Sequence, residues 1–108
     1  VVIPVCPEVT GGLPVPRVPV ELQNRRAINK NGEDVTAYFR RGVEQTMARL
    51  SAEGIDLAIL QPRSPSCGCR EIYDGSFSGK KISGKGLFAQ ALADAGIPLQ
   101  SAEEIENI

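Results

Sequence analysis

The clearest pattern along the chain is a helical stripe of apolar residues in its first half. Five apolar positions recur at spacings of four, four, four and three residues: Val35, Phe39, Val43, Met47 and Leu50. This spacing puts them on one face and predicts an amphipathic helix over residues 35–53 that packs against a core. Asp34 is a residue type that caps helix starts, and Gly54 suits the left-handed position after a helix end.

Shorter apolar runs predict strands around this helix. The other expected elements are strands at 1–5, 20–22, 26–28, 55–60 and 97–100, a helix at 87–95, and a short last helix that Ser101 and Glu104 begin as a capping box. The segment from Pro7 to Pro19 contains four prolines and predicts an extended loop without a helix. Alternating helices and strands predict that residues 1–108 form one α/β domain with a mostly parallel sheet.

The composition narrows the chemistry that such a domain can perform. The chain has 108 residues, a formal net charge of −1, three cysteines and no histidine. The lack of histidine excludes Ser–His and Cys–His catalytic pairs. Balanced charge argues against nucleic-acid binding, and no apolar run is long enough to cross a membrane. An odd cysteine count argues against a disulfide framework and favours the reducing cytoplasm.

The loops that hold chemistry are expected at the carboxyl ends of strands, where α/β domains bind ligands. The first such loop begins at Cys6 and continues through Glu8. A thiol and a carboxylate two residues apart in a proline-stiffened loop suit a metal ligand beside an acid–base group. The alternative is a small buried cysteine that closes the strand, followed by a solvated glutamate.

The second loop follows the buried strand at 55–60 and is dense in polar groups. It holds a guanidinium, two hydroxyls and two thiols, from Arg63, Ser64, Ser66, Cys67 and Cys69. Ser64 can donate a hydrogen bond, and Arg63 can lower the pKa of a thiol or bind an anion. Cys-x-Cys alone is a weak metal signal. The alternative is an ordinary polar turn.

Two glycine-containing stretches follow. Gly84-Lys85-Gly86 precedes the expected second helix, where backbone N–H groups can approach an anion, with a plain turn as the alternative. Tyr73-Asp74-Gly75 is equally consistent with a hairpin turn in which Tyr73 packs against the core.

Four motifs occur together and in one order. They are Cys6-Pro7-Glu8 with Gly11-Gly12-Leu13-Pro14-x-Pro16-Arg17, then Asn31-Gly32-x-Asp34-Val35-Thr36, then Ser64-Pro65-Ser66-Cys67-Gly68, and last Ile72-Tyr73-Asp74-Gly75-x-Phe77-Ser78-Gly79. The chain from Val5 to about Glu103 thereby resembles the domain-of-unknown-function 523 family, whose characterised members are thiouracil desulfidases. The resemblance implies a Rossmann-like α/β domain that holds a 4Fe–4S cluster on three cysteines, with one iron open to the sulfur of a thiolated substrate.

The resemblance also implies roles for individual residues and a reaction. Carried over by motif position, these are the cluster ligands Cys6 and Cys67, the acid–base residue Glu8, and Ser64 as a second catalytic or substrate-orienting group. From the polar character of the loop we also expect Arg63 and Ser66 to contact the substrate. The implied reaction is non-redox: a thiolated small molecule such as thiouracil reacts with water and gives uracil, and its sulfur leaves by way of the cluster.

The sequence departs from the family at its beginning. In the family a further strand with its own cysteine precedes the Cys-Pro-Glu loop, whereas this sequence starts at Val1. We therefore expect an amino-terminally truncated domain without its third ligand, with Cys69 as the alternative third ligand. Such a chain would lack cluster and activity, and an exposed sheet edge would favour a homodimer. Two other functions stay open: a non-catalytic module that binds metal or sulfur, and a cluster-free thiol enzyme that uses Cys67.

Overall fold

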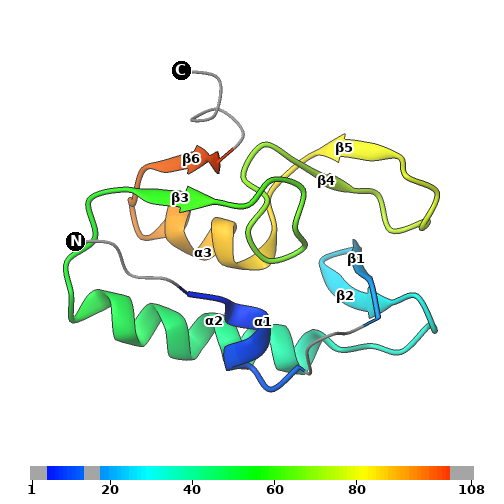
Figure 1. Cartoon of the computed structure of the whole chain (residues 1–108), viewed down its shortest axis with the longest axis horizontal. Coiled ribbons are helices and arrows are strands. Elements are labelled where there is room, and N and C mark those ends of the chain that lie inside the picture. Colours follow the sequence, from blue (N-terminus) through cyan, green and yellow to red (C-terminus); the bar gives the residue numbers. More distant parts are fainter. Residues whose placement is uncertain (1–4, 14–17, 103–108) are drawn as a thin grey trace.

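The computed structural model describes residues 5–13 and 18–102. The expected first strand, apart from Val5, and the expected last helix, beyond Ala102, lie outside the described residues. The elements are α1 (Pro7–Thr10), β1 (Val20–Gln23), β2 (Arg26–Asn29), α2 (Thr36–Ser51), β3 (Ala58–Leu60), β4 (Glu71–Tyr73), β5 (Lys81–Ser83), α3 (Leu87–Asp94) and β6 (Leu99–Ser101) (Figure 1).

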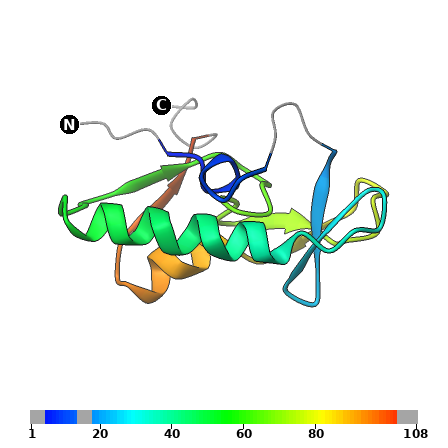
Figure 2. The same cartoon turned by 90° about the horizontal axis from the view of Figure 1, so that it is seen from below.

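The α/β class expected from the sequence is confirmed. Of the strand pairs in the described part of the chain, β3–β6 is parallel, while β1–β2 and β4–β5 are antiparallel, so the expected mostly parallel sheet is not found there. Arg63 and Ile72 form a further isolated parallel bridge. Helix α2 lies along one side of the molecule and packs against both α1 and α3 (Figures 1 and 2). Among the helices of the described residues, none has the length and apolar character required to cross a membrane.

The predicted long helix is confirmed as α2, a few residues shorter at its ends. Phe39 and Leu50 of the predicted stripe are buried, at 0% and 6% exposure. At the start of α2 the N–H of Thr36 donates to Asp34 Oδ1 over 2.9 Å. The hydrogen bond from Arg26 is the main cause that holds the pKa of Asp34 below its ordinary value. Gly54 adopts the expected left-handed conformation, with a φ of 71°.

The expectation of no helix between Pro7 and Pro19 is wrong at its beginning. Residues Pro7–Thr10 form α1, a single helical turn in which Gly11 N–H donates to Pro7 O over 2.9 Å. Pro7 stands at the start of this turn, where a residue needs no N–H donor and where the fixed φ of proline already suits a helix. Proline therefore begins this helix, although it would break a helix at an interior position.

Helix α1 approaches α2 so closely that the contact is made by two glycines. A Cβ atom on Gly42, in the middle of α2, would overlap the carbonyl oxygen of Pro7. A Cβ atom on Gly11 would overlap the carbonyl oxygen of Tyr38. Backbone thus packs directly on backbone. This contact sets the position of α1 and of the two candidate site residues, Cys6 and Glu8, that belong to it.

Gly42→Ala tests this contact, because two effects of opposite sign compete at this position. Alanine within a helix normally stabilises it by about 0.5–1 kcal/mol relative to glycine. Here the added methyl group forces α1 away from α2, and overpacking of this kind costs about 1–3 kcal/mol. We expect a net loss of about 1–2 kcal/mol in the free energy of unfolding, measured by urea denaturation. Gln45→Ala, at an exposed α2 position, is the control; a Gly42→Ala protein as stable as that control would contradict the contact.

Candidate functional site

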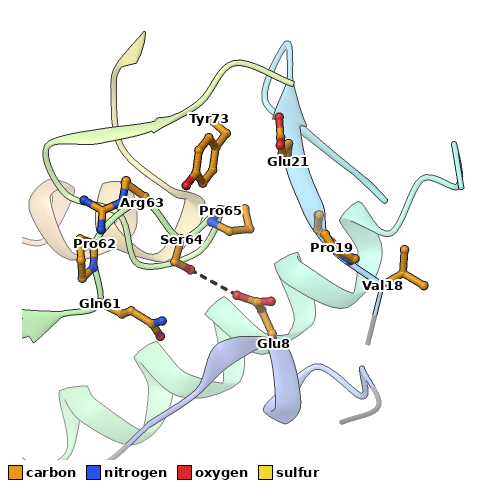
Figure 3. A pocket seen from close by; sticks show the side chains of 11 residues that line it. Glu8, Val18, Pro19, Glu21, Gln61, Pro62, Arg63, Ser64, Pro65 and Tyr73 are labelled. Carbon is orange, nitrogen blue, oxygen red and sulfur yellow. Dashed lines mark hydrogen bonds between the residues drawn. The ribbon is translucent and has the colours of Figure 1, made fainter. Parts of the chain in front are cut away.

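The structure brings together the two loops that carry the predicted chemistry. Glu8 of α1 is 8% exposed, and its Oε2 accepts a hydrogen bond from Ser66 Oγ over 2.7 Å. Ser64 Oγ donates to the same oxygen over 3.3 Å (Figure 3). Glu8 and Ser64 are 56 residues apart in the sequence. Two hydroxyls therefore hold one buried carboxylate oxygen, and the loop after β3 is joined to α1.

The direction of these hydrogen bonds follows from the backbone of the loop. Ser64 Oγ accepts the N–H groups of Ser66 and Cys67 over 3.2 and 3.1 Å. With both amides aimed at its lone pairs, the Ser64 hydroxyl keeps its proton available for donation. The two serine Oγ atoms lie 3.0 Å apart. The result is a compact polar network in which loop backbone orients the hydroxyls and the hydroxyls orient Glu8.

The start of α3 anchors this loop. The N–H groups of Phe88 and Ala89 both donate to Ser66 O, over 2.8 and 2.9 Å. Leu87 N–H donates to Pro65 O over 2.9 Å, and Gly86 N–H donates to Gly68 O over 2.8 Å. An anion at the start of α3 would need these same N–H groups, and they already donate to carbonyl oxygens of the loop. The prediction that backbone N–H groups of the Gly84–Gly86 stretch bind an anion is therefore wrong for Gly86. A Cβ atom at Gly86 would lie 2.6 Å from Ser66 O, so the close approach requires glycine.

The environment of Cys67 raises the pKa of its thiol, whereas an activated cysteine nucleophile needs a lowered pKa. Burial, as the largest cause, raises the pKa of Cys67 to about 11, and the charges of Glu8, Cys6 and Cys69 act in the same direction. The hydrogen bond from Ser66 opposes them. The expectation that Arg63 lowers the pKa of a thiol is therefore wrong. Its guanidinium lies instead 4.0 Å from Glu71 Oε1.

The three cysteines occupy different environments. Cys6 is exposed at the start of α1, and Cys67 is half-buried. Cys69 is 4% exposed and belongs to the core cluster that includes Leu50 and Phe88. Within residues 5–13 and 18–102, no three side chains of the metal-binding types gather in one group. Cys6 and Cys67 act electrostatically on one another beside Glu8, and their thiolates are the soft donors that iron–sulfur clusters use.

A pocket of about 490 Å³ opens beside this network. Of the residues predicted for the site, Glu8, Arg63 and Ser64 line it (Figure 3). Ser66 was expected to contact substrate, but it is 1% exposed and is not among the lining residues; its hydroxyl holds Glu8 instead. The predicted cluster ligands Cys6 and Cys67 are not among the lining residues. The pocket can therefore present a carboxylate and a hydroxyl to a small molecule.

Sequence reasoning missed part of the pocket wall. Glu21, Gln61 and Tyr73 also line it. Glu21 belongs to β1 and Tyr73 to β4, so this part of the wall comes from strands and not from the two site loops. A signal was present for Tyr73, which lies in the fourth motif next to the buried Ile72, so alternation along a strand would turn it away from the core.

Comparisons with known proteins agree with this geometry. A family model described as 2-thiouracil desulfurase matches residues 1–104. The chain is 37% identical over 113 residues to the uncharacterised protein YbbK of Bacillus subtilis (strain 168). This alignment covers 95% of this chain and 75% of YbbK. Among solved structures, it is similar to the 4Fe–4S-dependent thiouracil desulfidase TudS, with a TM-score of 0.90 and 42% identity over 95% of this chain and 68% of that chain. The resemblance drawn from the four motifs is confirmed.

The environments of the cysteines predict their order of alkylation in metal-free, folded protein. At about pH 8, iodoacetamide should modify the exposed Cys6 first, because only thiolates react and the pKa of Cys67 is raised to about 11. The rate at Cys67 should then rise about tenfold per pH unit, since its thiolate fraction does so below the pKa. Peptide mass spectrometry measures each site, and urea-unfolded protein, in which all three should react similarly, is the control. Faster labelling of Cys67 than of Cys6 at about pH 8 would contradict the assigned environments.

Proposed function

The chain belongs to the 2-thiouracil desulfurase family, and from that premise we propose that it removes sulfur from a thiouracil-like small molecule without a redox step. In the proposed reaction a thiocarbonyl and one water give a carbonyl and hydrogen sulfide. The oxygen of water forms the new bond to carbon, the carbon–sulfur bond breaks, and both protons of water end on the sulfur. No electron donor or acceptor is required.

One observation carries the proposal: the Glu8 carboxylate, two residues after Cys6 and held by Ser64 and Ser66, lines a pocket that can admit a small molecule. A buried carboxylate in the chain of a metal-binding family needs a reason to be there, because burial of a charged group is costly unless polar groups hold it. Here Ser64 and Ser66 hold it. The chain has no histidine, so a carboxylate is the natural choice for proton transfer.

We assign Cys6 and Cys67 as two of the three cysteine ligands of a 4Fe–4S cluster. Such clusters are bound by cysteine thiolates, and the family relative TudS is 4Fe–4S-dependent. Metal binding would displace the proton that a pKa of about 11 otherwise keeps on Cys67. When bound, the cluster supplies a thiophilic Lewis acid for the sulfur of the substrate.

The remaining steps are assigned to side chains of the pocket. Glu8 takes a proton from the attacking water and returns it to the departing sulfur. Ser64 turns its hydroxyl proton from Glu8 to a carbonyl oxygen of the substrate, while Arg63 supplies a cation to the same pocket. Ser66 is a positioning residue that keeps Glu8 from rotating, since its Oγ lies 2.7 Å from the carboxylate.

The cluster-free thiol enzyme fits the site less well. A nucleophilic cysteine at neutral pH needs a lowered pKa, and that of Cys67 is raised. A non-catalytic sulfur- or metal-binding module would use the same thiols without needing Glu8. Whether Glu8 is needed for sulfide release therefore distinguishes the proposed enzyme from a non-catalytic module.

Glu8→Gln tests the acid–base role in the full-length protein after anaerobic reconstitution with iron and sulfide. We expect the variant to keep the broad absorbance near ~400 nm while sulfide release from 2-thiouracil falls by about 100-fold or more, because the amide cannot transfer the proton. Glu44→Gln removes an equal charge from an exposed position on α2 and is the control. Full activity in Glu8→Gln would refute the assignment, and a cluster-loaded wild type that releases no sulfide from thiolated pyrimidines would favour the non-catalytic module.

The cysteine assignments predict two classes of variant. Cys6→Ser and Cys67→Ser should each lose the absorbance near ~400 nm, because each removes a thiolate ligand. Cys69→Ala should retain it and lower the free energy of unfolding by about 1 kcal/mol, since a small core side chain is truncated. Absorbance and urea denaturation are measured on the same preparations. A Cys69→Ala protein that stays folded but loses the absorbance would make Cys69 a ligand.

A further inference from the structure

The pocket has a second wall, which the proposed chemistry leaves unused. This wall comes from β1 and from the β4–β5 hairpin, which contribute Glu21 and Tyr73. In Figure 3 Tyr73 lies on the hairpin side of the pocket and Glu8 on the α1 side, with Ser64 between them. Among the lining residues that the structure describes, Tyr73 is the one aromatic side chain.

The direction of Tyr73 follows from the alternation along β4. Its neighbour Ile72 is 5% exposed and packs in the core cluster with Leu22 and Phe39. Successive side chains of a strand point to opposite faces, so the strand that buries Ile72 turns Tyr73 toward the pocket. Packing of the core therefore fixes the orientation of the aromatic ring.

Contacts to β1 hold the hairpin in place. Glu21 Oε1 accepts the N–H groups of Gly75 and Phe77 over 3.0 and 3.1 Å. Gln23 Nε2 donates to Gly75 O over 2.7 Å. The backbone just after Tyr73 is thus bound by two side chains of one neighbouring strand. A side chain on so constrained a segment loses little conformational freedom when a ligand binds.

We propose that Tyr73 is a specificity-determining residue that stacks on the planar ring of a thiolated heterocycle. This inference rests on the proposed function. A ring stacked on Tyr73 meets Ser64 and Glu8 with its polar edge, where the reacting carbon and sulfur lie. The preferred substrates are then conjugated nitrogen heterocycles, and ringless thiocarbonyl compounds such as thiourea are poor substrates because they offer no face to stack.

Equilibrium dialysis of labelled uracil, the desulfurated product, tests the stacking role apart from catalysis. The full-length, cluster-loaded protein is used under anaerobic conditions. Loss of base stacking on an aromatic side chain weakens binding by about 5- to 150-fold, so Tyr73→Leu should raise the Kd of uracil by a factor in this range. Tyr73→Phe, which keeps the ring, should stay within about threefold of wild type. Tyr38→Leu changes the chain's other tyrosine, which is 42% exposed on α2 and outside the pocket, and is the matched control.

Kinetics with two substrates supply a second measurement on the same proteins. Tyr73→Leu should raise KM for 2-thiouracil by a factor similar to that for the Kd, with a much smaller change for thiourea. Absorbance near ~400 nm and circular dichroism establish that each variant is folded and loaded.

The results that would contradict ring stacking alone differ from the result that would also contradict the proposed function. Unchanged uracil binding in Tyr73→Leu, or equal losses in Tyr73→Leu and Tyr73→Phe, overturns ring stacking while sulfide release by wild type leaves the proposed function standing. A wild type that releases sulfide but binds no uracil also overturns it. If wild type neither binds uracil nor releases sulfide, both the inference and the proposed function fail.

Discussion

Four backbone N–H groups at the start of α3 hold the loop after β3, and the geometry of the candidate site depends on them. They bind the carbonyl oxygens of Pro65, Ser66 and Gly68, with two of the four on Ser66. The first N–H groups of a helix have no partners inside it, and the positive end of the helix dipole favours carbonyl oxygens there. Helix α3 is itself fixed in the core by Phe88 and Leu92, so core packing is transmitted through α3 to the loop that carries Ser64 and Cys67.

The other half of the site depends on a helix that could not exist alone. A single turn such as α1 is far shorter than an isolated helix needs in water, so its stability comes from packing on α2. The two halves then meet through Glu8 and the serine hydroxyls. Because the carboxylate comes from α1 and the hydroxyls from the loop, their contact reports whether both halves are correctly placed.

Local patterns predicted much of this fold and part of the site. The stripe from Val35 to Leu50 indicated α2 because periodicity over many residues averages out single exceptions. Periodicity cannot indicate helix α1, since one turn is too short to show any, and a proline-rich segment such as the one after Pro7 more often excludes a helix than begins one. The strands β4 and β5 each begin with a charged residue, so neither contains the apolar run that indicates β3. The motifs pointed to Glu8 and Ser64, and Tyr73 lies in the last motif, but the burial of Ser66 and the placement of Tyr73 and Glu8 around one pocket result from long-range packing that no local pattern encodes.

Gly42 also sets a limit on how this protein can be engineered. A thermostabilisation scheme that scores each helix position by intrinsic propensity would replace a glycine in the middle of α2 with alanine. At this position the methyl group would enter the space of the Pro7 carbonyl, on the helix that carries Glu8. Selection for a more stable α2 and selection for correct placement of Glu8 therefore make opposite demands on one residue, and a design that treats each helix separately would not detect the conflict.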